Sequence, residues 1–533
     1  MANDSTAAGT SHQSVGRGAF LVAAGIFLSR IAGLIRDRVF SHFFGLSYAA
    51  DAFRAAVRIP NFLQNLFGEG VLSASFIPVY AKLVAEEKRE EAGRVAGAIF
   101  SLLALVTAAL VLSGVLATPY LIDAIAPGFK GETRRLAIQL VRIFFPGVGL
   151  LVLSAWCLGI LNSHRKFFLS YASPVVWNLA IISALIIYGH SELAQLAVYA
   201  AWASVAGSAL QFLIQLPVVL RLAPAIRLTL GSANEHVRVV VKNFFPVFVG
   251  RGVTQLSAYV DNFLASFLPT GAVAALFNAQ TLYMLPISLF GMSVSAAELP
   301  AMSSALGSRE QVAESLRARI SSSTRRIGFF VVPSAIAFLA LGDIVAGTIY
   351  QTGKFTHSDV TYVWSILAGS AIGLVAATVG RLYSSAYYAL RDTRTPLRYA
   401  LVRVILTTGL GCLFALPAGA PLGPRLMGID PRWGVAGLTA SAGFAAWIEF
   451  LLLRRGMNRR IGQVRFPAIY FAKLWYGGVV AAAVGWGLRL GLHPHDPLVA
   501  GAVILIPYGL VYLGLTVLLG IEQAEALVKR LRR

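Results

Sequence analysis

A short segment near the beginning of the chain combines ionisable side chains with a strongly hydrophobic background. Between Arg30 and Glu69 there are five arginines and three acidic residues, within sequence that is otherwise apolar enough for a membrane. A charge at the depth of a bilayer is costly, so such residues usually face an aqueous cavity and mark a transport path. Because most of this charge is positive, the sequence predicts a protein that moves an anion across a membrane.

Arginine is well suited to holding a phosphate. Its guanidinium keeps its charge and can donate two parallel hydrogen bonds to phosphate oxygens, which lysine cannot do. Several guanidinium groups in a cavity of low dielectric would offset the dehydration of a diphosphate, and nearby acids would hold them in place when no anion is bound. The candidate substrate-binding residues are Arg30, Arg36, Asp37, Asp51, Arg54, Arg58, Asn61, Glu69 and Arg251.

The spacing of the polar residues predicts that they share helix faces. In the first hydrophobic span, Arg30 and Asp37 share a face, whereas Arg36 points elsewhere. The second span, taken as one helix over 48–84 that bends near Pro60, has a single polar stripe. That stripe contains Asp51, Arg54, Arg58, Asn65 and Glu69. A shorter stripe in the seventh span contains Arg251, Gln255 and Asn262, with Asp261 adjacent.

Two plainer interpretations of these charges stay open. Arg36 and Arg54 could extend towards the membrane surface while their stems remain in the hydrocarbon. Acid–base pairs such as Arg30 and Asp37 could instead link helices structurally. Arg30 and Arg58 are the strongest candidates for substrate binding, because each lies in the middle of a span with an apolar turn on both sides.

The whole chain has the composition of an all-α polytopic membrane protein. Its 533 residues are 57% hydrophobic and 13% charged, and its mean hydropathy is +0.71, which is too apolar for an ordinary soluble protein. A membrane-spanning helix needs about 20 apolar residues. Fourteen such stretches are predicted, at 18–44, 48–84, 95–120, 132–161, 169–189, 193–220, 239–268, 272–305, 327–350, 360–389, 396–417, 434–453, 467–489 and 498–520.

The distribution of charge predicts the orientation in the membrane. The net charge is +21, but the basic residues gather in loops that follow even-numbered spans, which indicates topology rather than binding to nucleic acid. By the positive-inside rule both termini are cytoplasmic, and the polar residues 1–16 form a disordered cytoplasmic tail. The chief exception is an outer loop and the helix start that follows it, which contain Lys130, Arg134 and Arg135.

The second half of the chain repeats the first at an offset of 224–226 residues. The segment 126–129 resembles 352–355, and Asp37 aligns with Asp261. Because the offset contains an even number of spans, the copies have the same orientation, and a substrate site is expected between them. The predicted domains are a tail (1–16), an N-lobe (17–222), a linker (223–238), a C-lobe (239–456), and spans 13 and 14 with a basic tail (457–533).

Six strings extend over nearly the whole chain and are specific when taken together: SRIAGLIRD, LFGEG, FIPV, APGF, YQTGKF and YYALRDTRTP. They resemble the MurJ (MviN) family of lipid II flippases, within the multidrug/oligosaccharidyl-lipid/polysaccharide exporter superfamily. The resemblance implies two six-span lobes around a V-shaped cavity, with spans 13 and 14 forming a groove for an undecaprenyl tail. It also implies roles in the cavity for Arg30, Arg36, Asp37, Asp51 and Arg58.

The sequence departs from the family pattern at positions that bind the head group and an ion. Charged residues of the family are replaced by Gln64, Asn65, Gln280 and Thr281. Arg251 is a candidate substitute for the missing cations. Asp261 matches a possible sodium-coupling position, but its usual partners in the eleventh span are absent. The driving force is therefore left open between the membrane potential, sodium and protons, and no cofactor is expected.

The sequence favours a flippase that moves lipid II from the inner to the outer leaflet of the bacterial cytoplasmic (inner) membrane by alternating access. The chain is not expected to be an enzyme, because it has no nucleophile, metal-ligand or catalytic-acid constellation. The alternatives are a flippase for another polyprenyl-diphosphate oligosaccharide, a cation-coupled drug antiporter of the same superfamily, a membrane glycosyltransferase, and a non-transporting scaffold. A monomer that works with cell-wall synthesis enzymes is expected.

Overall fold

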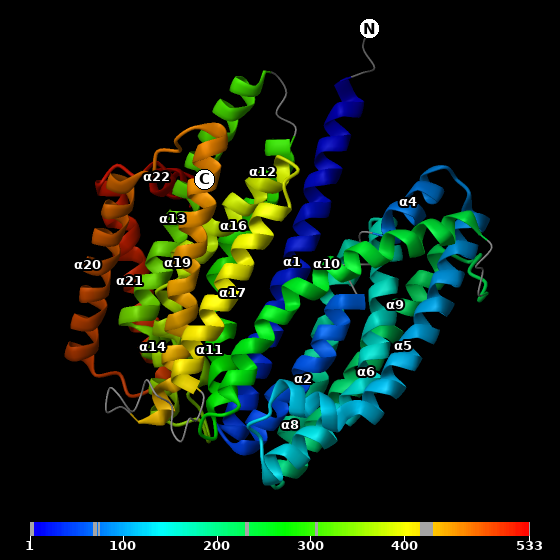
Figure 1. The fold of residues 1–533 in the computed structure, drawn as a ribbon, viewed down its shortest axis with the longest axis horizontal. Helices are drawn as coiled ribbons and strands as arrows, with labels where there is room; N and C mark the ends of the chain where they lie inside the picture. Colours follow the sequence, from blue (N-terminus) through cyan, green and yellow to red (C-terminus); the bar gives the residue numbers. More distant parts are fainter. Residues whose placement is uncertain are drawn as a thin grey trace. The chain divides into compact units, whose positions relative to one another are not determined.

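The computed structural model describes residues 5–67, 72, 75–229, 234–303, 308–415 and 430–531. Within these residues, regular secondary structure is helical apart from one isolated β-bridge between Thr352 and Phe355 (Figure 1). The predicted all-α class is confirmed. The chain divides into two compact units, Met1–Phe263 and Leu264–Arg533. The predicted lobe boundaries at 17–222 and 239–456 stay a prediction.

The first unit is a bundle of long helices arranged around α6. Its core helix α6 packs against α2, α5 and α9. The elements are α1 (Ser5–Phe44), α2 (Tyr48–Phe67), α4 (Ile77–Ala85), α5 (Arg89–Ile125), α6 (Gly131–Ser163), α7 (Phe167–Ala172), α8 (Pro174–Ile187), α9 (Leu193–Leu222) and α10 (Glu235–Ala265).

Buried polar side chains join the helices of this bundle. The Gln215 side chain on α9 donates hydrogen bonds of 2.7 Å to the Ser154 hydroxyl of α6 and 2.8 Å to the Ser173 hydroxyl at the start of α8. The Trp156 indole of α6 donates to the backbone carbonyl of Ala96 on α5. Because polar groups in a membrane interior have no bulk water to bind, such bonds between helices favour one arrangement of the bundle.

The second unit is also helical. Its helix α19 packs against α15, α16 and α17, while α20 pairs with α21 and also contacts α13. The elements are α11 (Ala272–Pro286), the π-helix η1 (Ile287–Met292), α12 (Ser293–Ser303), α13 (Arg309–Ala340), α14 (Gly342–Tyr350), α15 (His357–Ala371), α16 (Leu374–Ala389), α17 (Arg394–Ala415), the 3₁₀-helix η2 (Pro431–Trp433), α19 (Gly434–Ile461), α20 (Ala468–Leu492), α21 (Pro497–Leu518) and α22 (Glu522–Leu531).

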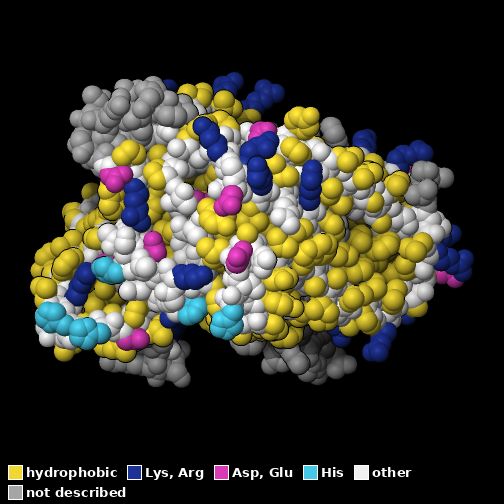
Figure 2. Space-filling view, turned by 90° about the horizontal axis from the view of Figure 1, so that it is seen from below, with side chains coloured by type: hydrophobic (Ala, Val, Ile, Leu, Met, Phe, Trp, Pro, Cys, Tyr) yellow, Lys and Arg dark blue, Asp and Glu magenta, His cyan; other side chains and the backbone are white. Residues whose placement is uncertain are grey.

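Ten described helices are long and apolar enough to cross a membrane, or eleven if α15 and α16, bent by 44°, form one crossing. The other three predicted spans, 18–44, 48–84 and 239–268, coincide with α1, with α2 and α4, and with α10. These are the segments that contain the predicted charged sites. The total of fourteen therefore stays a prediction. Hydrophobic side chains form broad surface areas (Figure 2), as expected for a protein surrounded by lipid.

The predicted single helix over 48–84 stays a prediction, because residues 68–71, 73 and 74 lie outside the described residues. Helix α2 continues through Pro60 as far as Phe67, and α4 begins at Ile77. A proline inside a helix removes one backbone hydrogen bond, but here the neighbouring turns maintain the helix. The polar stripe as far as Arg58 consequently lies on one uninterrupted helix.

The internal repeat is visible in the backbone of each unit. Arg165 (φ 57°) and Arg391 (φ 59°) adopt the left-handed conformation at equivalent helix ends. In the first unit the backbone N–H of Lys166 donates to Leu161 at 2.8 Å, and in the second that of Asp392 donates to Tyr387 at 2.9 Å. The same 6→1 bond closes both helix ends. These matching turns support the repeat that was read from the sequence.

Candidate functional site

A buried ion-pair cluster joins the first two helices. The Asp37 carboxylate of α1 accepts hydrogen bonds of 3.0 Å from Arg36 and 3.0 Å from Arg54 of α2, all at its Oδ1 atom. The side chains of Asp37 and Arg54 are only 4% and 3% exposed, whereas that of Arg36 is 18% exposed. Two cations thus surround one carboxylate, and a second buried carboxylate, Asp51, lies one turn before Arg54 on α2.

Arg36 extends the cluster to a third helix. Its second guanidinium nitrogen donates to the Asn178 side chain of α8 at 3.0 Å, and the guanidinium lies 5.1 Å from the centre of the Trp177 ring. The prediction that Arg36 points away from Asp37 is wrong, because a long side chain can turn back to its neighbour in sequence. The other cation, Arg54, stacks 4.2 Å over Phe40, a favourable cation–π geometry.

The close fit of this cluster supports the structural interpretation for Asp37 and Arg54. A buried charge that loses its partner is strongly destabilising, so such groups are held firmly in place. They would orient Arg36, whose side chain is more exposed than that of Arg54. Contact between any of these residues and a substrate stays a prediction.

The second arginine of α2 meets the end of α10 within the same unit. Tyr259 donates a 2.8 Å hydrogen bond to the Arg58 backbone carbonyl, and its ring packs edge-on against Phe62 at 5.4 Å. Asp261 is close enough to the half-buried Arg58 for their charges to interact. The two repeat-related aspartates thus act on arginines of α2 that are one turn apart, Asp37 on Arg54 and Asp261 on Arg58.

The other predicted residues differ in their burial. Asp51 is buried, one turn before Arg54, while Arg30 and Asn61 are exposed. Glu69 and the side chain of Arg251 lie outside the described residues, as do the side chains of Asn65 and Gln255. Sequence reasoning missed Tyr259 and Asn178, because neither one carries a charge and their partners lie far away in the sequence.

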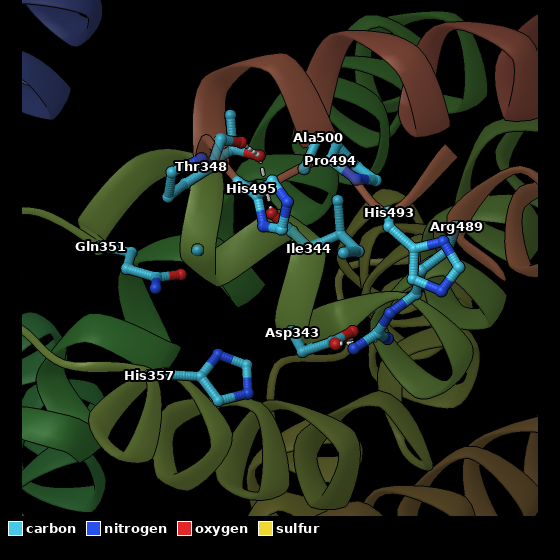
Figure 3. A pocket seen from close by; sticks show the side chains of 12 residues that line it. Asp343, Ile344, Thr348, Gln351, His357, Arg489, His493, Pro494, His495 and Ala500 are labelled. Atoms are coloured by element: carbon cyan, nitrogen blue, oxygen red, sulfur yellow. Dashed lines mark hydrogen bonds and ion pairs between the residues drawn. The ribbon is translucent and has the colours of Figure 1, made fainter. Parts of the chain in front are cut away.

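The second unit contains a polar cavity that sequence reasoning did not predict. Figure 3 shows Asp343 of α14 facing Arg489 of α20, with three histidine side chains around the same space. The ion pair between Arg489 and Asp343 measures 2.6 Å. The cavity encloses about 300 Å³ and its ionisable lining residues are Asp343, His357, Arg489, His493 and His495. Among the described residues, no group of three or more His, Cys, Asp or Glu side chains could hold a metal ion.

Many apolar helices with ion pairs buried among them are features of a polytopic membrane transporter. A comparison with known protein families is more specific: residues 40–495 match the family described as lipid II flippase MurJ. The chain therefore belongs to the MurJ family, and it is a multi-pass membrane protein.

Individual relatives agree with this assignment. The chain is 30% identical over 525 residues to the lipid II flippase MurJ of Burkholderia cenocepacia, an alignment that covers 95% of this chain and 98% of the relative. It also resembles a solved structure of lipid II flippase MurJ in an inward closed conformation, with a TM-score of 0.75, 25% identity and coverage of 94% and 98%. An inward-facing multidrug resistance MATE family transporter shares the fold, with a TM-score of 0.65 and 19% identity over 83% of this chain and 98% of the transporter.

Proposed function

We propose that the protein moves lipid II from the inner to the outer leaflet of the bacterial cytoplasmic membrane. The observation that carries this proposal is the surplus of arginine over acid where α1, α2 and α10 meet. From Arg30 to Arg58, α1 and α2 carry five arginines, against Asp37 and Asp51 on the same helices and Asp261 near Arg58. A surplus of positive charge at membrane depth suits an anionic head group, and the names of the family relatives supply its identity.

In the proposed mechanism the diphosphate binds to Arg30, Arg36 and Arg58, and the protein makes no covalent bond. Asp37 and Arg54 hold Arg36 in position through the shared carboxylate. Asp261 offsets the charge of Arg58 until the diphosphate arrives. Alternating access then exposes the bound head group to the outer leaflet while the tail remains in lipid.

The energy source is part of the proposal. Asp261 faces a guanidinium, which lowers its attraction for a sodium ion. This favours the membrane potential over sodium bound at Asp261. Cytoplasmic termini, a monomeric state and cooperation with cell-wall synthesis enzymes belong to the same proposal.

Two other cargoes compete with lipid II. A different polyprenyl-diphosphate oligosaccharide offers the same phosphates, and only its sugars differ. A cation-coupled drug antiporter agrees with the likeness to the MATE fold, but the positive surplus around α2 disfavours cationic drugs.

Rescue of a bacterium depleted of its own lipid II flippase tests the proposal. Arg58→Ala should abolish rescue at normal membrane levels. Arg489→Ala serves as the matched control, since it removes an arginine from the other unit, and it should rescue. Full rescue by Arg58→Ala would contradict the proposal.

A further inference from the structure

A surface hollow on the first unit contains two arginines that the proposed mechanism does not use. It measures about 430 Å³ and is lined by Arg135, Ile138, Gln139, Arg142, Ile143 and Trp202. Arg135, Gln139 and Arg142 are spaced by four and three residues, so they lie on one face of α6. Trp202 comes from α9, which packs along α6.

The positive charge of this hollow is not offset. Within the described part of the chain, no acid lies within ion-pair distance of Arg135 or Arg142, and both side chains are exposed. Arg134, the neighbour of Arg135, differs, because it binds Asp123 through two hydrogen bonds of 2.7 and 2.8 Å. Glu132, one turn before Arg135, does not line the hollow.

The uncharged part of α6 places the hollow at the membrane boundary. Residues 143–163 contain no Asp, Glu, Lys or Arg, and Arg165 and Lys166 follow them. At about 1.5 Å per residue this stretch is about 30 Å long, the thickness of the hydrocarbon core. On this count the hydrocarbon part of α6 begins near Ile143 rather than at residue 132, which would place Arg142 at the level of the lipid phosphates.

The charge pattern of α9 leads independently to the same depth for the hollow. Residues 203–220 are uncharged and end at Arg221, so Trp202 lies at nearly the same height as Arg142. Trp202 is 54% exposed. Tryptophan is enriched at the boundary between hydrocarbon and head groups, where one edge of its ring is apolar and the other wet.

We propose that this hollow binds the phosphate of an anionic phospholipid, in the leaflet that the predicted topology makes the outer one. Arg142 and Arg135 would bind the phosphate oxygens, and the Gln139 amide would donate to the head group. Trp202 would pack against the first carbons of the acyl chains. A zwitterionic lipid would bring its own cation towards two guanidinium groups, so the hollow favours a lipid with net negative charge. The proposal also explains why basic residues occur here, on the side of the membrane that the positive-inside rule leaves poor in them.

Native mass spectrometry of the purified full-length protein tests this binding. The protein is incubated with phosphatidylglycerol or with phosphatidylcholine of the same acyl chains, and the apparent Kd of each complex is measured. The unmodified protein should prefer phosphatidylglycerol. Arg135→Gln with Arg142→Gln should weaken phosphatidylglycerol binding at least about tenfold, with little change for phosphatidylcholine.

Matched variants separate this site from general surface charge. Arg134→Gln removes one charge from the same turn outside the hollow, and it should keep the preference for phosphatidylglycerol. Arg142→Lys keeps the charge but cannot donate two parallel hydrogen bonds. Its affinity for phosphatidylglycerol should therefore lie between those of the unmodified protein and the double variant. Unchanged phosphatidylglycerol binding in the double variant would overturn the proposal. So would an equal loss for both lipids, or an equal loss in Arg134→Gln.

Discussion

The two units use an aspartate–arginine pair in different ways. In the first unit, Asp37 binds two arginines, and its partner Arg54 is as deeply buried as Asp37 itself. In the second unit, the 6% exposed Asp343 binds Arg489, whose side chain is 30% exposed and lines a cavity with three histidines. Around the first cluster, α1 and α2 carry five arginines and two aspartates between residues 30 and 58, whereas the second pair balances one arginine with one aspartate.

The buried pair of Asp37 and Arg54 helps to hold the helices of the first unit together. The pair of Asp343 and Arg489 lies beside an open cavity of the second unit. A buried pair loses its hydration and regains it through accurate hydrogen bonds, so removing one partner is expensive. A pair beside a wet cavity keeps part of its hydration. The surplus charge of the first unit is the feature that suits an anionic cargo, and each of the following tests addresses one side of this comparison.

The largest stability effect is expected for Asp37→Ala. It leaves two guanidinium groups without their shared carboxylate and should lower the free energy of unfolding by about 3–5 kcal/mol. Denaturant unfolding in detergent measures the change. Arg489→Ala, which leaves the less enclosed pair of the second unit incomplete, should cost clearly less. Equal losses would contradict the distinction between the two pairs.

Coupling within the buried pair gives the next effect. A double variant with Asp37→Asn and Arg54→Met removes both charges. Its free energy of unfolding should be at least about 1 kcal/mol higher than the two single losses, added together, predict. A double-mutant cycle on the free energies of unfolding measures this coupling. Additive losses would mean that Asp37 and Arg54 do not act as a pair.

A smaller effect is expected where Arg36 binds α8. Asn178→Ala removes the 3.0 Å hydrogen bond to Arg36 and should cost about 1–2 kcal/mol. Leu179→Ala changes the next residue, which is 52% exposed, and serves as the control. A greater loss in the control would show that the Arg36 contact contributes little.

The smallest effect concerns a carboxylate outside the membrane spans. Asp392 accepts hydrogen bonds from the Thr395 hydroxyl and from the Thr395 backbone N–H, and it forms an ion pair with Arg460. Led by the hydroxyl, these contacts lower the pKa of Asp392 to about 2. Because the folded pKa is below the ordinary value of 3.8, this stabilisation is present above pH 3.8 and is lost as the pH falls towards 2. The site is largely open to solvent, so Asp392→Asn should cost less than about 1 kcal/mol at pH 7. Titration of the unfolding midpoint checks this, and an undiminished cost at pH 2 would contradict the assignment.

Much of the architecture could be predicted from the sequence, because it depends on local patterns. The lengths of the hydrophobic stretches predicted most of the helices. The offset of the internal repeat relates the turns at Arg165 and Arg391, which have the same backbone conformation. The turn of Arg36 towards Asp37 and the gathering of His357, His493 and His495 depend on tertiary contacts, which no spacing rule encodes.

Binding of lipid II to purified protein tests the central claim most directly, namely that the arginine surplus of the first unit holds the diphosphate. Affinity is compared among the unmodified protein, Arg58→Ala and Arg489→Ala under the same detergent conditions. The account predicts that Arg58→Ala loses at least about tenfold in affinity while Arg489→Ala binds normally. Normal binding by Arg58→Ala, or an equal loss in both variants, would contradict it.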